Sequence, residues 1–595
     1  MVPDVPAIHR RFDYSVPPAL ESDLRVGSRV RVELHGRRVG AWVVEDRVSG
    51  TAGVRPKPLA ASSGDGPPPA LVSVAEWAAW RWAGPLSSFL GTASPPRVVR
   101  GAWSRPGPWP DPSGPAGPGV RPPPPGSPGG GSVALVDGVL DVEGAAAVVR
   151  LAPSLDAVLI VLEVVHRLGP AGVLVLAPSS ARSAQLASRL GRSGVDVSLM
   201  PDGWERAASG ATVVVGTRAA AWAPIPRLRA AVVLDAHDEA YREERAPTWS
   251  AVDVVIERGR RDRSPVVLIS SCPTVSMVEG RTVVTTARSV ERRGWPVVEV
   301  VDRTGDDPRT GLFSERLAHR LHAILDRPEG RAVCILNRTG RARLLACAQC
   351  GSLATCTRCG GAMAQSTDGA GLRCRRCDEG RPAVCAQCDS IRLKTLRIGV
   401  TRATEELSAL TGVEAREVTA SAEPTDLASA RLVVGTEAAL HRVPHADVVA
   451  FLDIDQHLLA ARFGAGEETL ALLARASRLV GARDGEGRVL VQTRIPDHEV
   501  LRAAVHADPT VLLGEERAIR STLGLPPFGA LAALRGPAAP AYAEMVAAVD
   551  GVSVSPLPGD GWLVRASTQS DLADALASVP RPPGRLRVEV DPTDV

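Results

Sequence analysis

Eight of the ten cysteines in this chain fall between residues 347 and 388, where they form four Cys-x2-Cys pairs. Such a pair makes a tight turn that presents two thiolates to one metal ion, and two pairs complete a tetrahedral site of four sulfurs. The segment therefore predicts two Zn²⁺ ions per chain. Because four thiolates leave no coordination position open, both ions are expected to be structural and not catalytic.

Loop lengths favour one way of sorting the eight cysteines into two sites. The inner two pairs are joined by residues 360–373, a length that suits a ribbon hairpin, and the outer two pairs would close around its base. Joining neighbours in sequence is the alternative, and it leaves only residues 351–355 and 378–384 as linkers. The favoured sites are Cys347, Cys350, Cys385 and Cys388 for the first ion, and Cys356, Cys359, Cys374 and Cys377 for the second.

The other two cysteines, Cys272 and Cys334, stand apart in apolar segments and are predicted to be buried structural thiols. The chain contains no apolar run of about 18 residues, so the sequence excludes a membrane span. Residues 1–11 carry charged side chains and no apolar signal-peptide core. We therefore expect a cytoplasmic protein, in which a disulfide framework is not expected.

Length and charge bound the remaining possibilities. A chain of 595 residues is too long for one core and predicts several domains. The net charge of +3 means that any nucleic-acid binding must come from local basic patches. Lys57 and Lys394 are the only lysines among 69 basic residues, so chemistry that requires a lysine has two candidate positions.

The pattern of apolar segments predicts an α/β multidomain protein. Residues 29–44 read as a β-hairpin, and four short apolar strands alternate with helices both before and after residue 306. Residues 104–132 are rich in Pro and Gly and cannot bury enough apolar surface to form an ordered structure, so we expect a flexible linker there. The predicted units are a β-rich domain (1–103), the linker (104–132), a first lobe (133–305), a second lobe (306–515) with the cysteine insertion (346–390), and an α+β domain (516–595).

Several motifs give the chain a resemblance to one family. Arg11-Phe-Asp-Tyr14, Val215-Gly-Thr-Arg-Ala219, Leu336-Asn-Arg-Thr-Gly340 and Leu523-Gly-Leu-Pro-Pro-Phe-Gly529 resemble segments of the primosomal replication-restart (PriA) family of superfamily 2 DNA helicases. All eight clustered cysteines have counterparts there. The resemblance implies two tandem RecA-like lobes with an inserted two-zinc ribbon, and an N-terminal domain that holds a DNA 3′ end. The family's winged-helix domain has no counterpart here, since only the linker occupies its place.

The chain departs from this family at the residues that handle ATP. A phosphate-binding loop needs glycines and a lysine, but the matching segment reads Leu151-Ala-Pro-Ser-Leu-Asp-Ala-Val-Leu159. The acidic magnesium box reads Leu234-Asp-Ala-His237, or places Asp235 as ligand after a one-residue slip, and the coupling motif reads Ser270-Ser-Cys-Pro-Thr274. The second-lobe arginine motif, Leu479-Val-Gly-Ala-Arg483, keeps one arginine of two. We therefore predict no catalytic residues, no ATP hydrolysis, and no use of ATP or Mg²⁺.

Five residues are candidates for DNA contact. Phe12, Asp13 and Tyr14 match the family's end-binding segment, where an aromatic ring can stack on a terminal base and a carboxylate can accept a hydrogen bond from a 3′-hydroxyl. Gly36 and Lys57 lie near positions where the family places further end contacts. The alternative is that the two aromatic residues are ordinary core residues. Residues 241–249 resemble the family's aromatic-rich DNA-sensing loop, where Trp249 would either sense DNA or simply pack.

The sequence thus predicts a replication-restart protein without helicase activity. It would bind stalled or abandoned forks and promote primosome assembly and loading of the replicative helicase, at the nucleoid. The partners that the resemblance implies are branched DNA, other primosome components, the replicative helicase and single-stranded DNA-binding protein. The first alternative is an active ATP-dependent 3′–5′ helicase of this family. The second is a zinc-ribbon protein that binds nucleic acid in another role.

Overall fold

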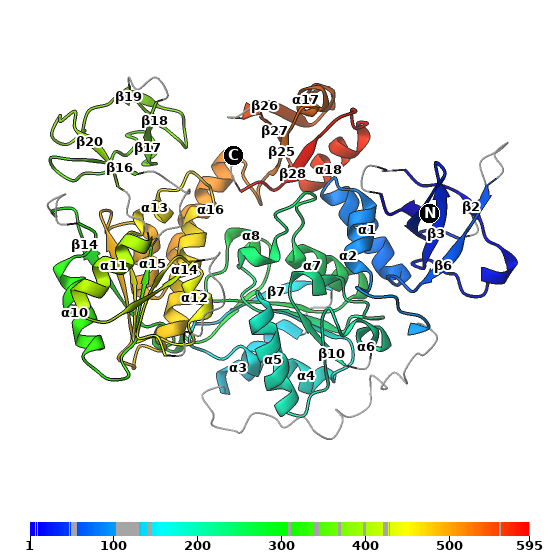
Figure 1. The fold of residues 1–595 in the computed structure, drawn as a ribbon, viewed down its shortest axis with the longest axis horizontal. Helices are drawn as coiled ribbons and strands as arrows, with labels where there is room; N and C mark the ends of the chain where they lie inside the picture. The colour runs from blue at the N-terminus through cyan, green and yellow to red at the C-terminus, as the bar shows by residue number, and fades with distance from the viewer. Residues whose placement is uncertain are drawn as a thin grey trace.

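The computed structural model describes residues 1–5, 8, 10–46, 48, 56–102, 130–140, 144–210, 212–306, 311–336, 344–366, 371–396, 400–419, 427, 429–557 and 561–593. Most of the expected linker 104–132, and residues 337–340 of the Leu336–Gly340 motif, lie outside the described residues. No helix within these ranges is both long and apolar enough to span a bilayer. Figure 1 shows the units side by side, with the N-terminal unit at one end and the cysteine segment at the other.

The N-terminal unit is a small sheet backed by two helices, α1 (Pro69–Arg81) and α2 (Leu86–Ala93). Its strand order is β1-β4-β3-β6, and a two-stranded parallel pair, β2-β5, lies beside it. The β3–β4 hairpin turns at His35 and Gly36, which both have positive φ (47° and 74°) as a tight hairpin turn requires. The strands are β1 (Val2–Pro3), β2 (Tyr14–Ser15), β3 (Arg29–Leu34), β4 (Arg37–Trp42), β5 (Lys57–Pro58) and β6 (Ala61–Gly64).

The first lobe is a seven-stranded parallel sheet in the order β13-β7-β12-β11-β8-β10-β9. Its central strands are apolar at every position and fully buried, because helices cover both faces of the sheet. The strands are β7 (Ala146–Arg150), β8 (Val173–Leu176), β9 (Val197–Leu199), β10 (Val213–Gly216), β11 (Ala230–Val233), β12 (Val266–Ser270) and β13 (Val283–Thr285). The helices are α3 (Gly130–Leu140), α4 (Val158–Leu168), α5 (Ser180–Arg192), α6 (Trp204–Ser209), α7 (Ala251–Asp262), α8 (Val275–Val278) and α9 (Arg288–Arg293).

The second lobe is a six-stranded parallel sheet in the order β14-β24-β23-β15-β22-β21. The strands are β14 (Val297–Asp302), β15 (Ala332–Ile335), β21 (Ala415–Val418), β22 (Leu432–Gly435), β23 (Val448–Phe451) and β24 (Arg488–Thr493). The helices are α10 (Glu315–Leu325), α11 (Val400–Thr411), α12 (Ala439–Arg442), α13 (Asp455–Leu458), α14 (Ala465–Val480), α15 (Glu499–His506) and α16 (Thr510–Leu523).

The boundary expected between the lobes, at residue 306, is wrong. Strand β14 pairs with β24 along its whole length, so the second sheet begins at Val297. The sequence analysis did not identify this strand, and which sheet a short apolar segment joins depends on long-range pairing.

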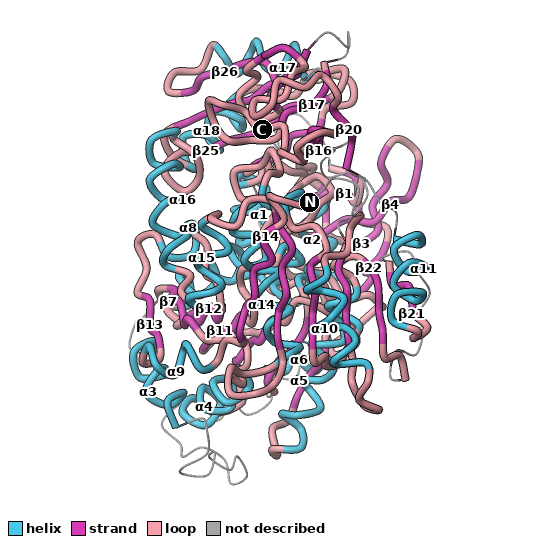
Figure 2. Tube along the Cα trace, turned by 90° about the vertical axis from the view of Figure 1, so that its left-hand side faces the viewer, coloured by secondary structure: helices cyan, strands magenta, loops and turns pink. Residues whose placement is uncertain are grey.

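Two smaller units complete the chain. The cysteine segment forms short antiparallel ribbons, β16-β20 and β17-β18-β19, which lie above the second lobe in Figures 1 and 2. The C-terminal unit is an antiparallel sheet in the order β26-β27-β25-β28 with two helices, which is the predicted α+β arrangement. The elements are β16 (Leu344–Cys347), β17 (Met363–Gln365), β18 (Gly371–Cys374), β19 (Gly380–Pro382), β20 (Leu393–Leu396), β25 (Ala530–Arg535), α17 (Ala539–Ala547), β26 (Val552–Leu557), β27 (Gly561–Ala566), α18 (Gln569–Ser578) and β28 (Arg587–Val590).

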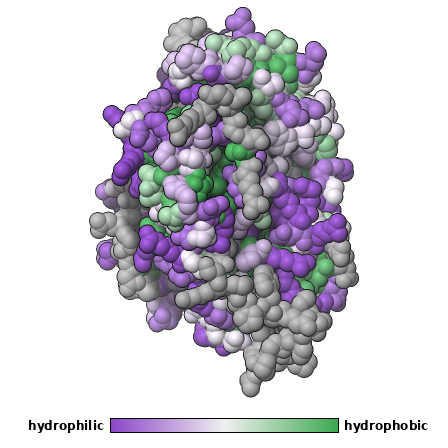
Figure 3. Space-filling model, turned by 90° about the vertical axis from the view of Figure 1, so that its right-hand side faces the viewer, coloured by the Kyte–Doolittle hydropathy of each residue, from purple (hydrophilic) through white to green (hydrophobic). Residues whose placement is uncertain are grey.

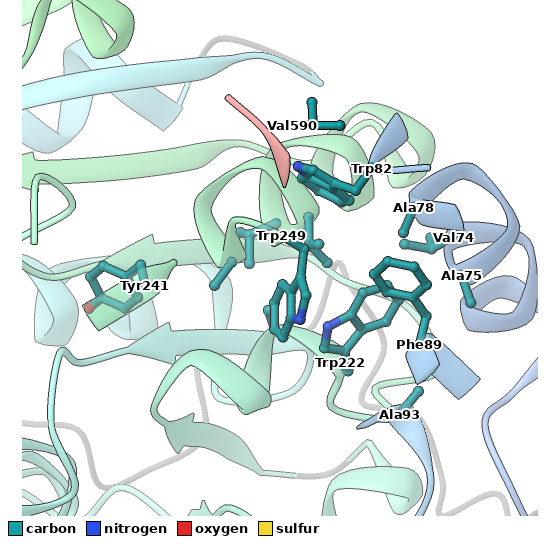
Figure 4. Close-up of a cluster of buried hydrophobic side chains, with 14 of the residues drawn as sticks. Val74, Ala75, Ala78, Trp82, Phe89, Ala93, Trp222, Tyr241, Trp249 and Val590 are labelled. Atoms are coloured by element: carbon teal, nitrogen blue, oxygen red, sulfur yellow. The ribbon is translucent and has the colours of Figure 1, made fainter. Parts of the chain in front are cut away.

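One hydrophobic core joins the N-terminal unit, the first lobe and the C-terminal unit. A row of aromatic rings, shown in part in Figure 4, runs from α1 into the first lobe. Trp82 packs against Phe89 with ring centroids 6.3 Å apart, Phe89 against Trp222 at 5.8 Å, and Trp222 against Trp249 at 5.7 Å. Val590 of β28 belongs to the same cluster. The three units are therefore one packed body.

We expect Trp82→Ala to lower the free energy of unfolding by about 3–5 kcal/mol, because Trp82 is 1 % exposed and its loss leaves a cavity at the junction of three units. Chemical denaturation followed by far-UV circular dichroism measures the change. The matched control is Trp80→Ala on the same helix, where a partly exposed ring donates one hydrogen bond to Asp574 (2.8 Å). Equal losses from both variants would contradict the shared core.

Candidate functional site

The eight clustered cysteines come together as two groups of four. In each group all four Sγ atoms lie within 4.8 Å of one another, and the groups combine the outer pairs and the inner pairs respectively. In the outer group Sγ–Sγ distances are 3.5 Å (Cys347–Cys388) and 3.6 Å (Cys350–Cys385). In the inner group they are 3.6 Å (Cys356–Cys377) and 3.5 Å (Cys359–Cys374). The arrangement is the one that loop lengths favour.

The geometry fits a tetrahedral metal site. Zinc–sulfur bonds of about 2.3 Å in tetrahedral array put the sulfurs about 3.8 Å apart. In each of the four turns the sulfur of the first cysteine also accepts the backbone N–H of the residue two positions later, at 3.3–3.4 Å. These N–H groups stabilise thiolates, which are the form that binds a metal ion.

The thiol pKa values within one group move in opposite directions. Hydrogen bonds from the side chain and backbone of Ser352 lower the pKa of Cys350 to about 6. The pKa of Cys388 is raised to about 12, although the backbone N–H of Ser390 opposes the rise, because three other sulfurs surround it. Four thiolates so close together require a cation to ionise at once. Each group therefore suits a divalent, thiophilic ion such as Zn²⁺.

The cysteine ribbon docks on the second lobe. Leu344 and Ala362 of the ribbon pack with Leu459 of the lobe in a small buried cluster. Arg494, which follows β24, donates from Nε to the carbonyl oxygen of Gly351 in the first turn of the ribbon (3.2 Å). The isolated cysteines Cys272 and Cys334 are buried within the lobes, and burial raises the pKa of both thiols to about 12.

Two of the five N-terminal candidates, Tyr14 and Lys57, lie together on one small polar surface. Tyr14 and Lys57 are paired neighbours on β2 and β5. Both contact Glu33 of β3: the Tyr14 hydroxyl donates to its carbonyl oxygen (3.1 Å), and Lys57 Nζ donates to its carboxylate (2.9 Å). Gly36 lies at the exposed turn that follows Glu33. The contact with Glu33, which raises the pKa of Lys57, has no signal in the sequence because it depends on pairing between strands.

Phe12 and Asp13 lie on the segment that enters β2. The main chain of Phe12 pairs with Met1 through two hydrogen bonds (2.8 and 3.0 Å), and its ring is half-buried. The Arg10 guanidinium lies over that ring, 4.8 Å from its centroid. The Asp13 side chain is exposed. The half-buried ring of Phe12 and the exposed carboxylate of Asp13 are therefore neighbours on this segment. Figure 3, which views this end of the molecule, shows polar surface with apolar patches between.

The segments compared above with the family's ATP motifs lie at the cleft between the lobes. Residues 151–157 follow β7, and Asp235 follows β11, so both lie at the carboxyl edge of the first sheet. Asp156 pairs with Arg189 of α5. Asp235 is buried with a positive φ of 49°. Burial opposes its ionisation, but the guanidinium of Arg478 outweighs burial and lowers the pKa of Asp235.

The sequence motifs did not identify Arg478 as a residue of this cleft. It lies on α14 of the second lobe and donates two hydrogen bonds to the carboxylate of Asp235 in the first lobe (2.8 and 2.5 Å). Arg483, the arginine that the motif retains, is elsewhere: it donates to the backbone carbonyls of Arg292 and Pro296 (3.2 Å each). Arg478 precedes the aligned motif by one position, so only the fold shows which arginine reaches the cleft.

The two aromatic residues of the segment that resembles an aromatic-rich loop are buried, while residues 244–246 between them are exposed. Tyr241 is 2 % exposed and donates its hydroxyl to the carbonyl oxygen of Leu234 (2.6 Å). Trp249 is 5 % exposed and packs on Trp222. Arg242 and Thr248 both donate to the carbonyl oxygen of Val590, which ties the loop to the last strand (3.1 and 3.3 Å). Of the two interpretations of Trp249, the structure favours packing.

Comparison with known proteins shows what this chain is similar to. Residues 2–95 match the family described as "3'DNA-binding domain (3'BD)" of PriA. The chain is 27% identical over 395 residues to replication restart protein PriA of Bacillus subtilis, covering 60% of this chain and 49% of that protein. It is 25% identical over 389 residues to the Haemophilus influenzae protein of that name, covering 60% and 53%. The chain thus spans about half the length of these relatives. Among solved structures, RecG bound to a three-way DNA junction aligns with 63% of this chain and 43% of its own, with a TM-score of 0.35 and 12% identity.

We expect the purified protein to carry two zinc ions per chain, and Cys356→Ser to reduce this to one, because a site left with three sulfurs binds the ion more weakly. Elemental analysis after gel filtration measures the ratio. Cys272→Ser is the matched control, since that thiol is buried away from both groups, and it should retain both ions. One ion or none in the unaltered protein would contradict the assignment.

Proposed function

Since this chain belongs to the PriA family, we propose that it binds DNA at replication forks through its N-terminal unit and acts in replication restart without turning over ATP. The observation that carries the proposal is the match of residues 2–95 to a 3′ DNA-binding domain. That segment coincides with a unit that has its own sheet and two helices.

The proposed contact surface is formed by Phe12, Asp13, Tyr14, Gly36 and Lys57. The half-buried Phe12 ring supplies a stacking surface, which is worth about 1–3 kcal/mol for each base. Asp13 is exposed next to it and can accept a hydrogen bond from a terminal 3′-hydroxyl. Lys57 supplies a positive charge that a phosphate can share with Glu33, because the ion pair is exposed and therefore weak.

The cleft between the lobes supports the second half of the proposal. The loop at 151–157 has no lysine or glycine to cradle phosphates. Asp235, the remaining acid near the magnesium position, is already held by Arg478 and is not available as a metal ligand. The lobes and the two-zinc ribbon would then serve as a platform for other primosome proteins and for the replicative helicase.

We expect Phe12→Ala to weaken binding to a fork with a 3′-hydroxyl at its junction by about tenfold to a hundredfold, through the lost stacking. Asp13→Ala, which removes the acceptor oxygens, should weaken binding only to the 3′-hydroxyl fork, and not to a fork that ends in a 3′-phosphate. Fluorescence anisotropy with the full chain measures both affinities at fixed salt, since phosphate contacts make affinity salt-dependent.

Asp23→Ala is the matched control for this experiment. Asp23 is an exposed carboxylate on the same unit, and its substitution should leave both affinities unchanged. Equal binding to the two fork ends, altered by neither Phe12→Ala nor Asp13→Ala, would mean that Phe12 and Asp13 serve the fold and not end capture.

We expect ATP turnover in the presence of forked DNA to stay at the level of an Asp235→Ala variant, because neither protein has a lysine at the phosphate position. A coupled phosphate-release assay with matched protein preparations measures the rates. DNA-stimulated turnover that Asp235→Ala abolishes would replace this proposal with that of an active helicase.

A further inference from the structure

The guanidinium of Arg478 occupies the place where an α/β lobe of this topology would bind a ligand. Open parallel sheets bind ligands at the carboxyl ends of their strands. Arg478 reaches that edge from the second lobe: it donates to both oxygens of Asp235, and its Nε lies 3.4 Å from the carbonyl oxygen of Pro153 in the loop after β7. The side chain thus bridges the two segments between which phosphates would lie.

A second ion pair crosses the cleft one turn earlier on the same helix. Arg475 of α14 donates to the carboxylate of Asp238 in the first lobe (2.5 Å). Residues three apart lie on one face of a helix, so a single face of α14 carries both guanidinium groups. Asp235 and Asp238 are both largely shielded from solvent, with side chains 10 % and 8 % exposed.

Apolar and backbone contacts also join the two lobes beside the Asp235–Arg478 pair. Ala152 of the loop after β7 belongs to the core of the second lobe together with Trp295, which is fully buried. A Cβ at position 294 would lie 2.5 Å from the Cβ of Ala152, which is closer than two carbon atoms can pack. Only glycine fits at this position without a shift of the loop. The backbone N–H of Ser154 donates to the carbonyl oxygen of Gly294 (3.1 Å). The loop is therefore in direct contact with the segment that leads into the second lobe.

The charges in this cleft do not depend on a ligand. In nucleotide-driven motors, an arginine finger pairs with phosphate charge that is lost when the phosphate leaves. Here the anions are the carboxylates of Asp235 and Asp238, which are part of the chain. Removing one partner of a shielded ion pair leaves the other charge uncompensated. Separating the lobes would therefore leave four charges without their partners: the two carboxylates of the first lobe and the two guanidinium groups of α14.

We propose that Arg475 and Arg478 form a clamp that holds the two lobes in one fixed relative orientation without nucleotide. The first lobe shares its core with the N-terminal unit, and the second lobe carries the cysteine ribbon. The clamp therefore fixes the spacing between the N-terminal unit and the ribbon. This inference concerns the lobes alone and does not depend on DNA binding, so the two can fail separately.

The test measures the distance between the lobes in the full chain. Spin labels on unnatural amino acids at Asp202 of the first lobe and Glu414 of the second, both exposed, avoid the cysteines. Pulsed electron resonance should give one narrow distance distribution, identical with and without a non-hydrolysable ATP analogue. The double variant Arg475→Gln/Arg478→Gln should broaden it at least about twofold. Hydrogen exchange at the backbone amides of Ala152, Ser154 and Leu155 should become at least about tenfold faster.

Arg206→Gln is the matched control. Arg206 also pairs with an aspartate, Asp196, but both side chains are exposed and lie within the first lobe, so the distribution should stay narrow. Should the double variant lose its circular dichroism spectrum, Arg478→Lys, which keeps the charge but not the two-pronged contact, takes its place and should broaden the distribution less. A distribution that narrows or shifts with the ATP analogue in the unaltered protein would overturn the clamp. So would a distribution that the folded variants leave unchanged.

Discussion

The row of buried aromatic rings from Trp82 to Trp249 is the interaction on which the arrangement of the molecule depends. It starts on α1 of the N-terminal unit, crosses Phe89 and Trp222, and ends beside the last strand of the chain. Because Phe89 packs on Trp222 across the boundary between two units, and residues of all three units share the core around these rings, no unit can move without opening this core. Segments from the two ends of the chain are thereby placed next to each other.

The same core changes the role of the loop at residues 241–249. The family resemblance predicted an aromatic-rich loop at these positions that senses DNA. Here the side chains of Tyr241 and Trp249 are buried in the core. The guanidinium of Arg218 also donates hydrogen bonds to the backbone carbonyls of Ala240 (3.2 Å) and Arg242 (2.7 Å). A loop held by so many internal contacts cannot change conformation cheaply. Its rigidity agrees with the proposal that there is no ATPase site to signal to.

Local patterns in the sequence predicted most elements, while long-range pairing escaped them. Four apolar strands in each lobe, the β3–β4 hairpin and the sorting of the eight cysteines follow from period, turn residues and loop length. The membership of β14 in the second sheet does not, because a short apolar strand fits either sheet. The contact of Lys57 with Glu33 and that of Arg478 with Asp235 join residues distant in sequence, and no local rule distinguishes one arginine among so many. At the cleft the motifs predicted a loss of ATP chemistry, and only the fold showed that Arg478 pairs with Asp235.

The charge balance of the cleft explains why several motifs depart from the family together. Asp235 is paired with Arg478, Asp238 with Arg475 and Asp156 with Arg189, so each acid has its own guanidinium. Arg182 lies close enough to Arg478 that this neighbour, together with burial, lowers the pKa of Arg182. A lysine restored to the loop at 151–157 would add a cation to a shielded site that has no unpaired acid among these residues, which costs stability unless phosphate is bound. Restoring a single motif would therefore destabilise the cleft, and only a concerted change of the loop, the acidic box and α14 would return it to a nucleotide site.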